Sequence, residues 1–86
     1  MVIVSLFDPN LKRIIDSYFY EKELVLSGEI NLSRLLRIIG EDLGYDLEKI
    51  CRSKPCLILL NREVISERNV SIKNNDRIEI FIQRKI

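Results

Sequence analysis

The residue types best suited to chemistry in this 86-residue chain are two cysteines, Cys51 and Cys56, in the segment CRSKPC. The chain contains no histidine. A structural zinc site needs four nitrogen or sulfur ligands, so these two thiols do not make one. Three interpretations stay open: two small apolar residues in a reducing compartment, a disulfide across a short loop, and a catalytic thiol. The first is the commonest role of such cysteines, and the third lacks a base nearby in the sequence.

Other groups for catalysis or ligand binding are sparse. The carboxylate pair Glu41 and Asp42 falls on the solvent side of a predicted helix. The arginines that could make a basic patch are interleaved with acidic residues: Arg34, Arg37, Arg62 and Arg68. A formal net charge of +1 gives no general electrostatic signal for nucleic acid, and the three glycines form no phosphate-binding run. We therefore expect no catalytic residues, no metal or cofactor and no enzymatic activity, and nucleic acid is a disfavoured partner.

Length and composition are those of a small globular protein. We expect one domain over residues 1–86. The content of 47% hydrophobic and 31% charged residues is typical of a folded chain rather than a disordered one. No apolar run approaches the roughly 20 residues that span a bilayer. Met1–Phe7 is too short for a signal peptide and has no basic flank, so we expect a cytoplasmic protein with no membrane partner.

Two strands around a short helix are predicted for the first part of the chain. Val2–Phe7 is almost continuously apolar, which indicates a strand covered on both faces or nearly so. Asp8 and Pro9 suit the N-cap and first position of a helix. Apolar residues then recur at helical spacing on one face: Leu11, Ile14, Ile15, Tyr18 and Phe19. A second strand is predicted at Glu23–Ser27, ended by Gly28, so the two strands form a wide hairpin.

The strongest periodic segment predicts the main helix. Asn31 can cap its start, and Gly44 suits its left-handed end. The residues expected to face the core are Leu32, Leu35, Leu36, Ile39 and Leu43. Gly40 weakens this helix locally, by up to about 1 kcal/mol relative to alanine. A further short turn of helix is predicted over 46–50.

Three more strands are predicted in the second half. Cys56–Leu60 is nearly continuously apolar, which indicates a central strand. Asn61–Arg62 is a turn candidate before a short returning strand at Val64–Ile65, and Asn74–Asp76 is a second turn. In the last strand, isoleucines form one fully apolar face: Ile78, Ile80 and Ile82.

These elements predict an α+β fold. One long helix with several strands suggests a mixed four- or five-stranded sheet with the main helix packed on one face. The passage from residue 24 to residue 60 should make a right-handed parallel crossover or a close relative of one.

Phe81 lies on the face of the last strand opposite to its isoleucines. An isolated exposed aromatic residue is the commoner interpretation of such a position. In the alternative, Phe81 forms an apolar patch with Leu57 or Leu59 on the open face of the sheet. A patch of that kind marks a protein interface.

Three segments together resemble a known family. They are INLSRLLRIIGEDLG, CLILLNREVI and NNDRIEIFI. In order and spacing they are similar to the ubiquitin-like sulfur carriers of the MoaD/ThiS family, which includes the small subunit of molybdopterin synthase. Members have a strand, a short helical turn, a second strand, a capped helix, a strand ending in Val-Asn-Gly, a short strand and a last strand. The resemblance implies a β-grasp (ubiquitin-like) fold over nearly the whole chain.

The resemblance also implies a use of the C-terminus. In the family, a partner enzyme adenylates the terminal carboxylate of a Gly-Gly tail with ATP, and sulfur then replaces the adenylate as a thiocarboxylate. Aligned without gaps from Asp76, Ile86 falls on the first glycine and the second is missing. The chain departs from the family there, because a β-branched Ile86 does not fit a channel made for glycine. The candidate partner-binding residues are Phe81, Gln83, Arg84 and Ile86.

The expected function follows from the resemblance. We expect a sulfur-carrier-family protein of molybdopterin or thiamine-type sulfur transfer, with an activating or synthase-type enzyme as its protein partner. The first alternative is a protein-interaction module of the same fold without the thiocarboxylate chemistry. An RNA-binding module of this fold is disfavoured by the near-neutral charge. An exposed edge strand leaves a homodimer open as a further alternative.

Overall fold

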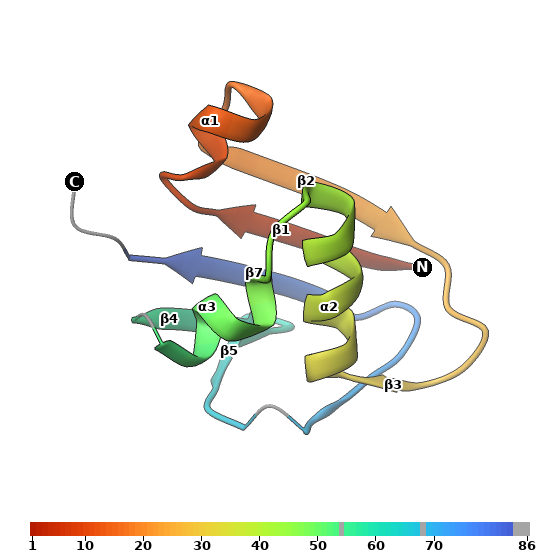
Figure 1. Cartoon of the computed structure of the whole chain (residues 1–86). Coiled ribbons are helices and arrows are strands. Elements are labelled where there is room, and N and C mark those ends of the chain that lie inside the picture. Colours follow the sequence, from red (N-terminus) through yellow and green to blue (C-terminus); the bar gives the residue numbers. More distant parts are fainter. Residues whose placement is uncertain (54, 68, 84–86) are drawn as a thin grey trace.

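Five strands form one mixed sheet in the computed structural model (Figure 1). The structure describes residues 1–53, 55–67 and 69–83. In spatial order the strands are β2 (Phe19–Leu24), β1 (Val2–Phe7), β7 (Arg77–Ile82), β4 (Cys56–Leu60) and β5 (Glu63–Ile65). The central pair β1 and β7 is parallel, while β1–β2, β7–β4 and β4–β5 are antiparallel. The predicted α+β class and mixed sheet are therefore confirmed.

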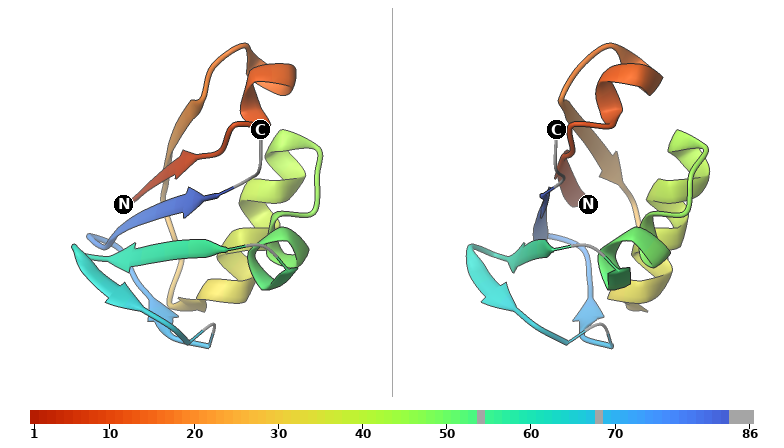
Figure 2. Two further views of the ribbon diagram at one scale, coloured as in Figure 1. Left: turned by 90° about the vertical axis from the view of Figure 1, so that its left-hand side faces the viewer. Right: turned by 60° about the vertical axis from the view of Figure 1, so that its left-hand side comes forward.

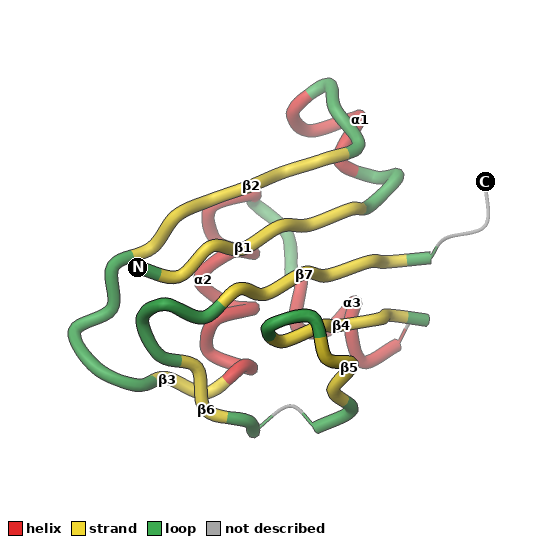
Figure 3. Tube along the Cα trace, turned by 180° about the vertical axis from the view of Figure 1, so that it is seen from behind, coloured by secondary structure: helices red, strands yellow, loops and turns green. Residues whose placement is uncertain are grey.

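Helices cover one face of this sheet. The short α1 (Leu11–Ile15) connects β1 to β2, and α2 (Leu32–Leu43) and α3 (Leu47–Ser53) precede β4. A separate two-stranded ladder pairs β3 (Ile30–Asn31) with β6 (Ser71–Ile72), and it was not predicted. Figure 2 shows α2 and α3 on the same side of the sheet, and Figure 3 looks onto the opposite side. Within the described residues, no helix is long and apolar enough to cross a membrane.

The main helix begins and ends where the sequence predicts. The Asn31 side chain accepts the backbone N–H of Arg34 at 2.8 Å, which is an N-cap bond. At the other end Gly44 adopts φ +83° and donates its N–H to the Gly40 carbonyl at 2.7 Å. All the residues predicted to face the core are buried: Leu32, Leu35, Leu36, Ile39 and Leu43.

The core lies between α2 and the sheet. Sheet residues that point toward the helices alternate with residues on the open face, as the two-residue period of a strand requires. Those buried against the helices include Val2, Val4, Leu6, Ile58, Ile78, Ile80 and Ile82. The prediction that the β7 isoleucines form the core face is confirmed.

The path from β2 to β4 is a relative of a parallel crossover, as predicted. Because β2 and β4 are each antiparallel to one member of the parallel pair, they run in the same direction. They are not neighbours, since β1 and β7 lie between them in the sheet. Helix α2 spans this gap on one face (Figure 1).

The predicted helix that included Phe19 is wrong in its extent. Helix α1 ends at Ile15, and the next residue, Asp16, has a left-handed backbone with φ +57°. Phe19 instead begins β2 and lies opposite Phe7. Among the residues assigned to one buried helical face, only Leu11 is buried. Pairing along the whole of β1 is a stronger constraint than the local helical period.

The position of the second strand and the cap of α1 also need correction. β2 ends at Leu24, and Val25 is 83% exposed. The first residue before α1 is Asn10, which makes no side-chain cap bond. Asp8 is buried nearby, and its Oδ1 accepts the Asn10 N–H at 3.0 Å. Its Oδ2 accepts the Tyr45 hydroxyl at 3.3 Å, which ties the start of α1 to the α2–α3 connection.

The two predicted asparagine turns are confirmed and are joined by side chains. Asn61 and Arg62 have φ +51° and +72°, and Asn75 has φ +79°. The Asn61 side chain donates to Asp76 Oδ1 at 2.9 Å and accepts the Arg77 N–H at 2.8 Å. The β4–β5 turn is thereby fixed to the start of β7.

Candidate functional site

Four apolar side chains form a row across the open face of the sheet. Phe19 of β2 lies opposite Phe7 of β1, Phe7 lies opposite Phe81 of β7, and Phe81 lies opposite Leu57 of β4. We call Phe19, Phe7, Phe81 and Leu57 the aromatic row. Phe7 is 36% exposed, Phe19 is 41% exposed and Leu57 is 46% exposed, and Phe81 is half-buried between its neighbours.

The rings of the row contact one another. Phe7 and Phe81 are stacked, with ring centroids 4.7 Å apart and an angle of 3° between the ring planes. Phe7 and Phe19 are tilted by 43°, with centroids 4.8 Å apart. Aromatic pairs at such separations add about 0.5–1.5 kcal/mol beyond the area that they bury. The rings are thus held in place before any partner arrives.

The expectation that β1 is covered on both faces or nearly so is wrong at its end, where Phe7 belongs to the row. Val2, Val4 and Leu6 are buried toward α2. On the other face Ser5 is buried and Ile3 is half-buried, but Phe7 is exposed. The described helices α2 and α3 lie on one side only (Figure 2). The apolar end of β1 is therefore a surface feature.

The strip next to the row is polar and acidic. One pleat away on the same face, Ser5 lies opposite both Glu21 of β2 and Glu79 of β7. The Ser5 hydroxyl donates to Glu21 at 3.2 Å. A partner that covers the row would therefore meet carboxylates at one side, which favours basic groups in the partner's rim.

The predicted site residues are brought together only in part. Phe81 lies on the face opposite to the isoleucines, next to Leu57, as the patch hypothesis expects. Leu59 is one row away, opposite Glu79. Gln83 is exposed after β7, and its N–H donates to the Pro55 carbonyl at 3.0 Å. Arg84 and Ile86 lie outside the described residues.

Phe7 and Phe19 were missed by sequence reasoning. The signal that could have found them is the pair of phenylalanines at the two ends of the segment between β1 and β2. A hairpin that closes across 8–18 places them directly opposite one another. Its closing bond is the Asp8 N–H donated to the Tyr18 carbonyl at 3.2 Å.

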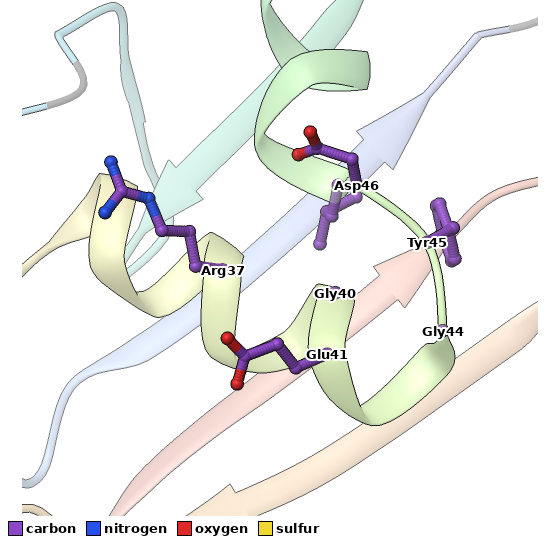
Figure 4. A pocket seen from close by; sticks show the side chains of 7 residues that line it. Arg37, Gly40, Glu41, Gly44, Tyr45 and Asp46 are labelled. Atoms are coloured by element: carbon purple, nitrogen blue, oxygen red, sulfur yellow. The ribbon is translucent and has the colours of Figure 1, made fainter.

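A depression of about 400 Å³ lies elsewhere, where α2 meets α3 (Figure 4). It is lined by Arg37, Gly40, Glu41, Gly44, Tyr45, Asp46 and Leu47. The side chains of Arg37, Glu41 and Asp46 point in different directions rather than toward a common point. Arg37 also donates to Glu48 at 3.1 Å. Charged groups that diverge in this way do not make an acid–base pair for catalysis.

A polar network joins β2 to α2. The Tyr20 hydroxyl donates to Asp42 Oδ2 at 2.5 Å, and Lys22 pairs with Asp42 Oδ1 at 2.9 Å. Burial, followed by the hydrogen bond to Asp42 and its negative charge, raises the pKa of Tyr20. Hydrogen bonds from Tyr20 and then Lys22 lower the pKa of Asp42. At neutral pH the Tyr20 phenol therefore stays protonated and the Asp42 carboxylate stays ionised. Both states favour the hydrogen bond that links β2 to α2.

No family model matches this sequence, and a comparison with curated proteins finds no significant match.

Proposed function

We propose that this chain is a ubiquitin-like β-grasp protein that acts by docking to a protein partner through the aromatic row. The β-grasp assignment is supported by the element order. A strand, a short helix, a strand, the capped main helix and three sheet strands occur in this order, with the short β3, α3 and β6 between them. That order agrees with the family resemblance of the sequence. The helix α2 across one face of a mixed sheet agrees with it as well.

The observation that carries the docking proposal is the exposure of contiguous apolar side chains from four strands. Phe7, Phe19 and Leu57 are each more than a third exposed, and they meet around Phe81. Keeping apolar surface in water is unfavourable, and aromatic anchors dominate the energy of many protein interfaces. Stacked rings on neighbouring strands lose little conformational freedom when a partner covers them.

The partner is proposed to be a protein with an apolar contact surface and a basic rim. The apolar part would cover the row, and the basic rim would face Glu21 and Glu79. An activating or synthase-type enzyme, as the family resemblance implies, is the first partner to test.

A Phe81→Ser substitution should weaken this docking at least tenfold, which corresponds to about 1.4 kcal/mol. Phe81 is the central ring of the row, between Phe7 and Leu57, so its loss breaks the apolar surface in two. The measurement is the dissociation constant for an activating or synthase-type enzyme of the family, by isothermal titration calorimetry.

The matched control is Val25→Ser, which removes an 83% exposed apolar side chain outside the sheet. This variant should bind as tightly as the parent chain. Circular dichroism must show that both variants stay folded. Equal affinity of the Phe81→Ser variant and the parent chain would mean that the interface lies elsewhere.

Sulfur transfer is the second candidate function, and the position of the row favours it. The row lies at the end of the sheet where the parallel strands β1 and β7 finish. A partner docked there would lie next to Gln83, which follows Ile82. In the family that the sequence resembles, the segment after this strand is the tail that enters a partner enzyme. Gln83 is the last described residue of that segment.

If sulfur transfer is the function, the partner's channel must accept Ile86 where the family has glycine. Incubation with ATP, such an activating enzyme and a sulfur donor should then convert the terminal carboxylate to a thiocarboxylate. Intact-mass spectrometry would detect a gain equal to the mass difference between sulfur and oxygen. A Phe81→Ser chain should convert more slowly, because activation requires docking. Tight docking of the parent chain without any mass gain would reject sulfur transfer and leave the docking proposal intact.

A further inference from the structure

Two thiols meet where α3 lies against the first residue of β4. Cys51 Sγ and Cys56 Sγ are 3.2 Å apart, and the Cys56 thiol donates to the Cys51 sulfur. Cys51 is only 3% exposed on α3, whereas Cys56 is half-buried at the start of β4. A disulfide bond is about 2.05 Å long, so the two sulfur atoms need to approach by only about 1 Å to bond.

We propose that Cys51 and Cys56 form a reversible disulfide that clasps α3 to β4 in response to the thiol–disulfide balance of the surroundings. The oxidant is a low-molecular-weight disulfide such as oxidised glutathione. Each oxidation of the cysteine pair converts two protein thiols and one external disulfide into one protein disulfide and two external thiols. This site is independent of the proposed docking function.

The difference in exposure sets the order of the two exchange steps. The Cys56 thiolate attacks one sulfur of the external disulfide, and the other half leaves as a thiolate that takes up the proton released by Cys56. The Cys51 thiolate then attacks Cys56 Sγ and expels the second half, which takes up the proton of Cys51. The buried Cys51 is poorly placed to meet a bulky external disulfide first.

The fold favours the second step over persistence of the mixed disulfide. α3 and β4 already hold the two sulfur atoms in contact in the reduced chain. A reaction between groups held in this way behaves as if one reactant were present at very high concentration. The mixed disulfide at Cys56 should therefore be short-lived.

The clasp closes next to the end of the last strand. Cys56 lies opposite Ile82, and the neighbouring Pro55 carbonyl accepts the Gln83 N–H at 3.0 Å. A covalent link between α3 and β4 restricts the unfolded chain, so oxidation should raise the melting temperature by roughly 5–15 °C. The same link holds the start of β4 in place, and the end of β7 is hydrogen-bonded to this part of the chain.

The experiment equilibrates the full chain with increasing ratios of oxidised to reduced glutathione. The samples are quenched with acid, unfolded, alkylated and weighed by mass spectrometry. We expect a direct transition from a doubly alkylated chain to an unalkylated chain that has lost two hydrogens. Thermal unfolding of the two forms should show the rise in melting temperature. The transition should not depend on protein concentration, because the bond lies within one chain.

Cys51→Ala is the informative variant, since it retains Cys56, the more exposed of the two thiols, and removes the thiol that resolves the mixed disulfide. This variant should accumulate the glutathione adduct at Cys56 and show no rise in melting temperature. If Cys51→Ala fails to fold because its site is buried, Cys56→Ser is the replacement. It also lacks the disulfide, so its melting temperature should not rise with oxidised glutathione. The proposal is overturned if the parent chain keeps both alkylatable thiols in excess oxidised glutathione, or if it stops at a stable adduct on Cys56.

Discussion

An Ile80→Ala substitution is expected to lower the free energy of unfolding by about 2–5 kcal/mol. Ile80 is fully buried in the middle of β7, where it lies opposite Leu6 of β1 and Ile58 of β4. Truncation removes apolar contacts with both neighbouring strands and leaves a cavity beneath α2 that a regular sheet cannot close. A domain of this size is stable by roughly 4–13 kcal/mol, so the loss is a large share of the total. Urea unfolding followed by circular dichroism measures it.

The matched control is the next residue of the same strand. Phe81→Ser alters a larger side chain on the open face, where it mainly removes the stacking on Phe7. That stacking contributes about 0.5–1.5 kcal/mol beyond the area that the ring buries. Because Phe81 is half-buried rather than fully buried, we expect the variant to lose less in total than the core truncation. Equal losses for the two variants would mean that both faces of β7 are covered, and the aromatic row would then not be a free surface.

Regular periods explain why β7 and α2 could be predicted from the sequence. Ile78, Ile80 and Ile82 repeat at the strand period, and Leu32, Leu35, Leu36, Ile39 and Leu43 repeat at the helix period. In both segments these apolar side chains point into the core between the sheet and α2, because each element has a single buried face. Asn61 and Asn75 could be placed in turns because asparagine tolerates the positive φ that both adopt.

The segment from α1 to β2 shows where a local period misleads. Leu11, Ile14, Ile15, Tyr18 and Phe19 fit one helical face, but all except Leu11 are exposed. Left-handed Asp16 ends the helix, and Phe19 pairs with Phe7 instead. The pairing of Phe19 and its neighbours with β1 makes this segment a strand. Strand pairing joins residues that are far apart in the sequence, so a short stretch of sequence does not reveal it.

Only two members of the aromatic row, Phe81 and Leu57, could be predicted from the sequence. Phe81 is recognisable because its strand alternates strictly, and Leu57 follows from the pairing of β4 with β7. Phe7 and Phe19 join the row only through the order β2–β1–β7–β4, which periodicity does not specify. The candidate site is therefore a product of strand order and register rather than of any sequence motif.

Gly40→Ala is expected to destabilise the fold by about 3 kcal/mol, near the upper end of the usual range for overpacking. On helix propensity alone the same change should stabilise α2 by up to about 1 kcal/mol. The structure reverses the sign, because a Cβ at Gly40 would lie 2.5 Å from the Tyr45 carbonyl oxygen and 3.1 Å from the Leu47 nitrogen. Both atoms belong to the backbone, so no side-chain rotation relieves the clash.

The α2–α3 connection that would have to move is itself tightly held. The Gly40 carbonyl accepts the N–H groups of Gly44 and Tyr45, and the Tyr45 carbonyl accepts the Leu47 N–H at 3.0 Å. The Tyr45 hydroxyl also donates to the buried Asp8. Displacing the connection therefore disturbs the end of α2, the start of α3 and the region before α1 together. Urea unfolding of the variant should show the loss at an unchanged slope.

Gly28→Ala is the matched control for this prediction. A Cβ at Gly28 meets no atom within 4 Å, and the residue does not have a left-handed backbone. Replacing a glycine at such a site reduces the freedom of the unfolded chain and should change stability by less than about 1 kcal/mol, in the stabilising direction. If Gly40→Ala proved as stable as Gly28→Ala, the helix would gain from alanine as in an isolated peptide. The close approach of the α2–α3 connection to α2 would then be absent in solution.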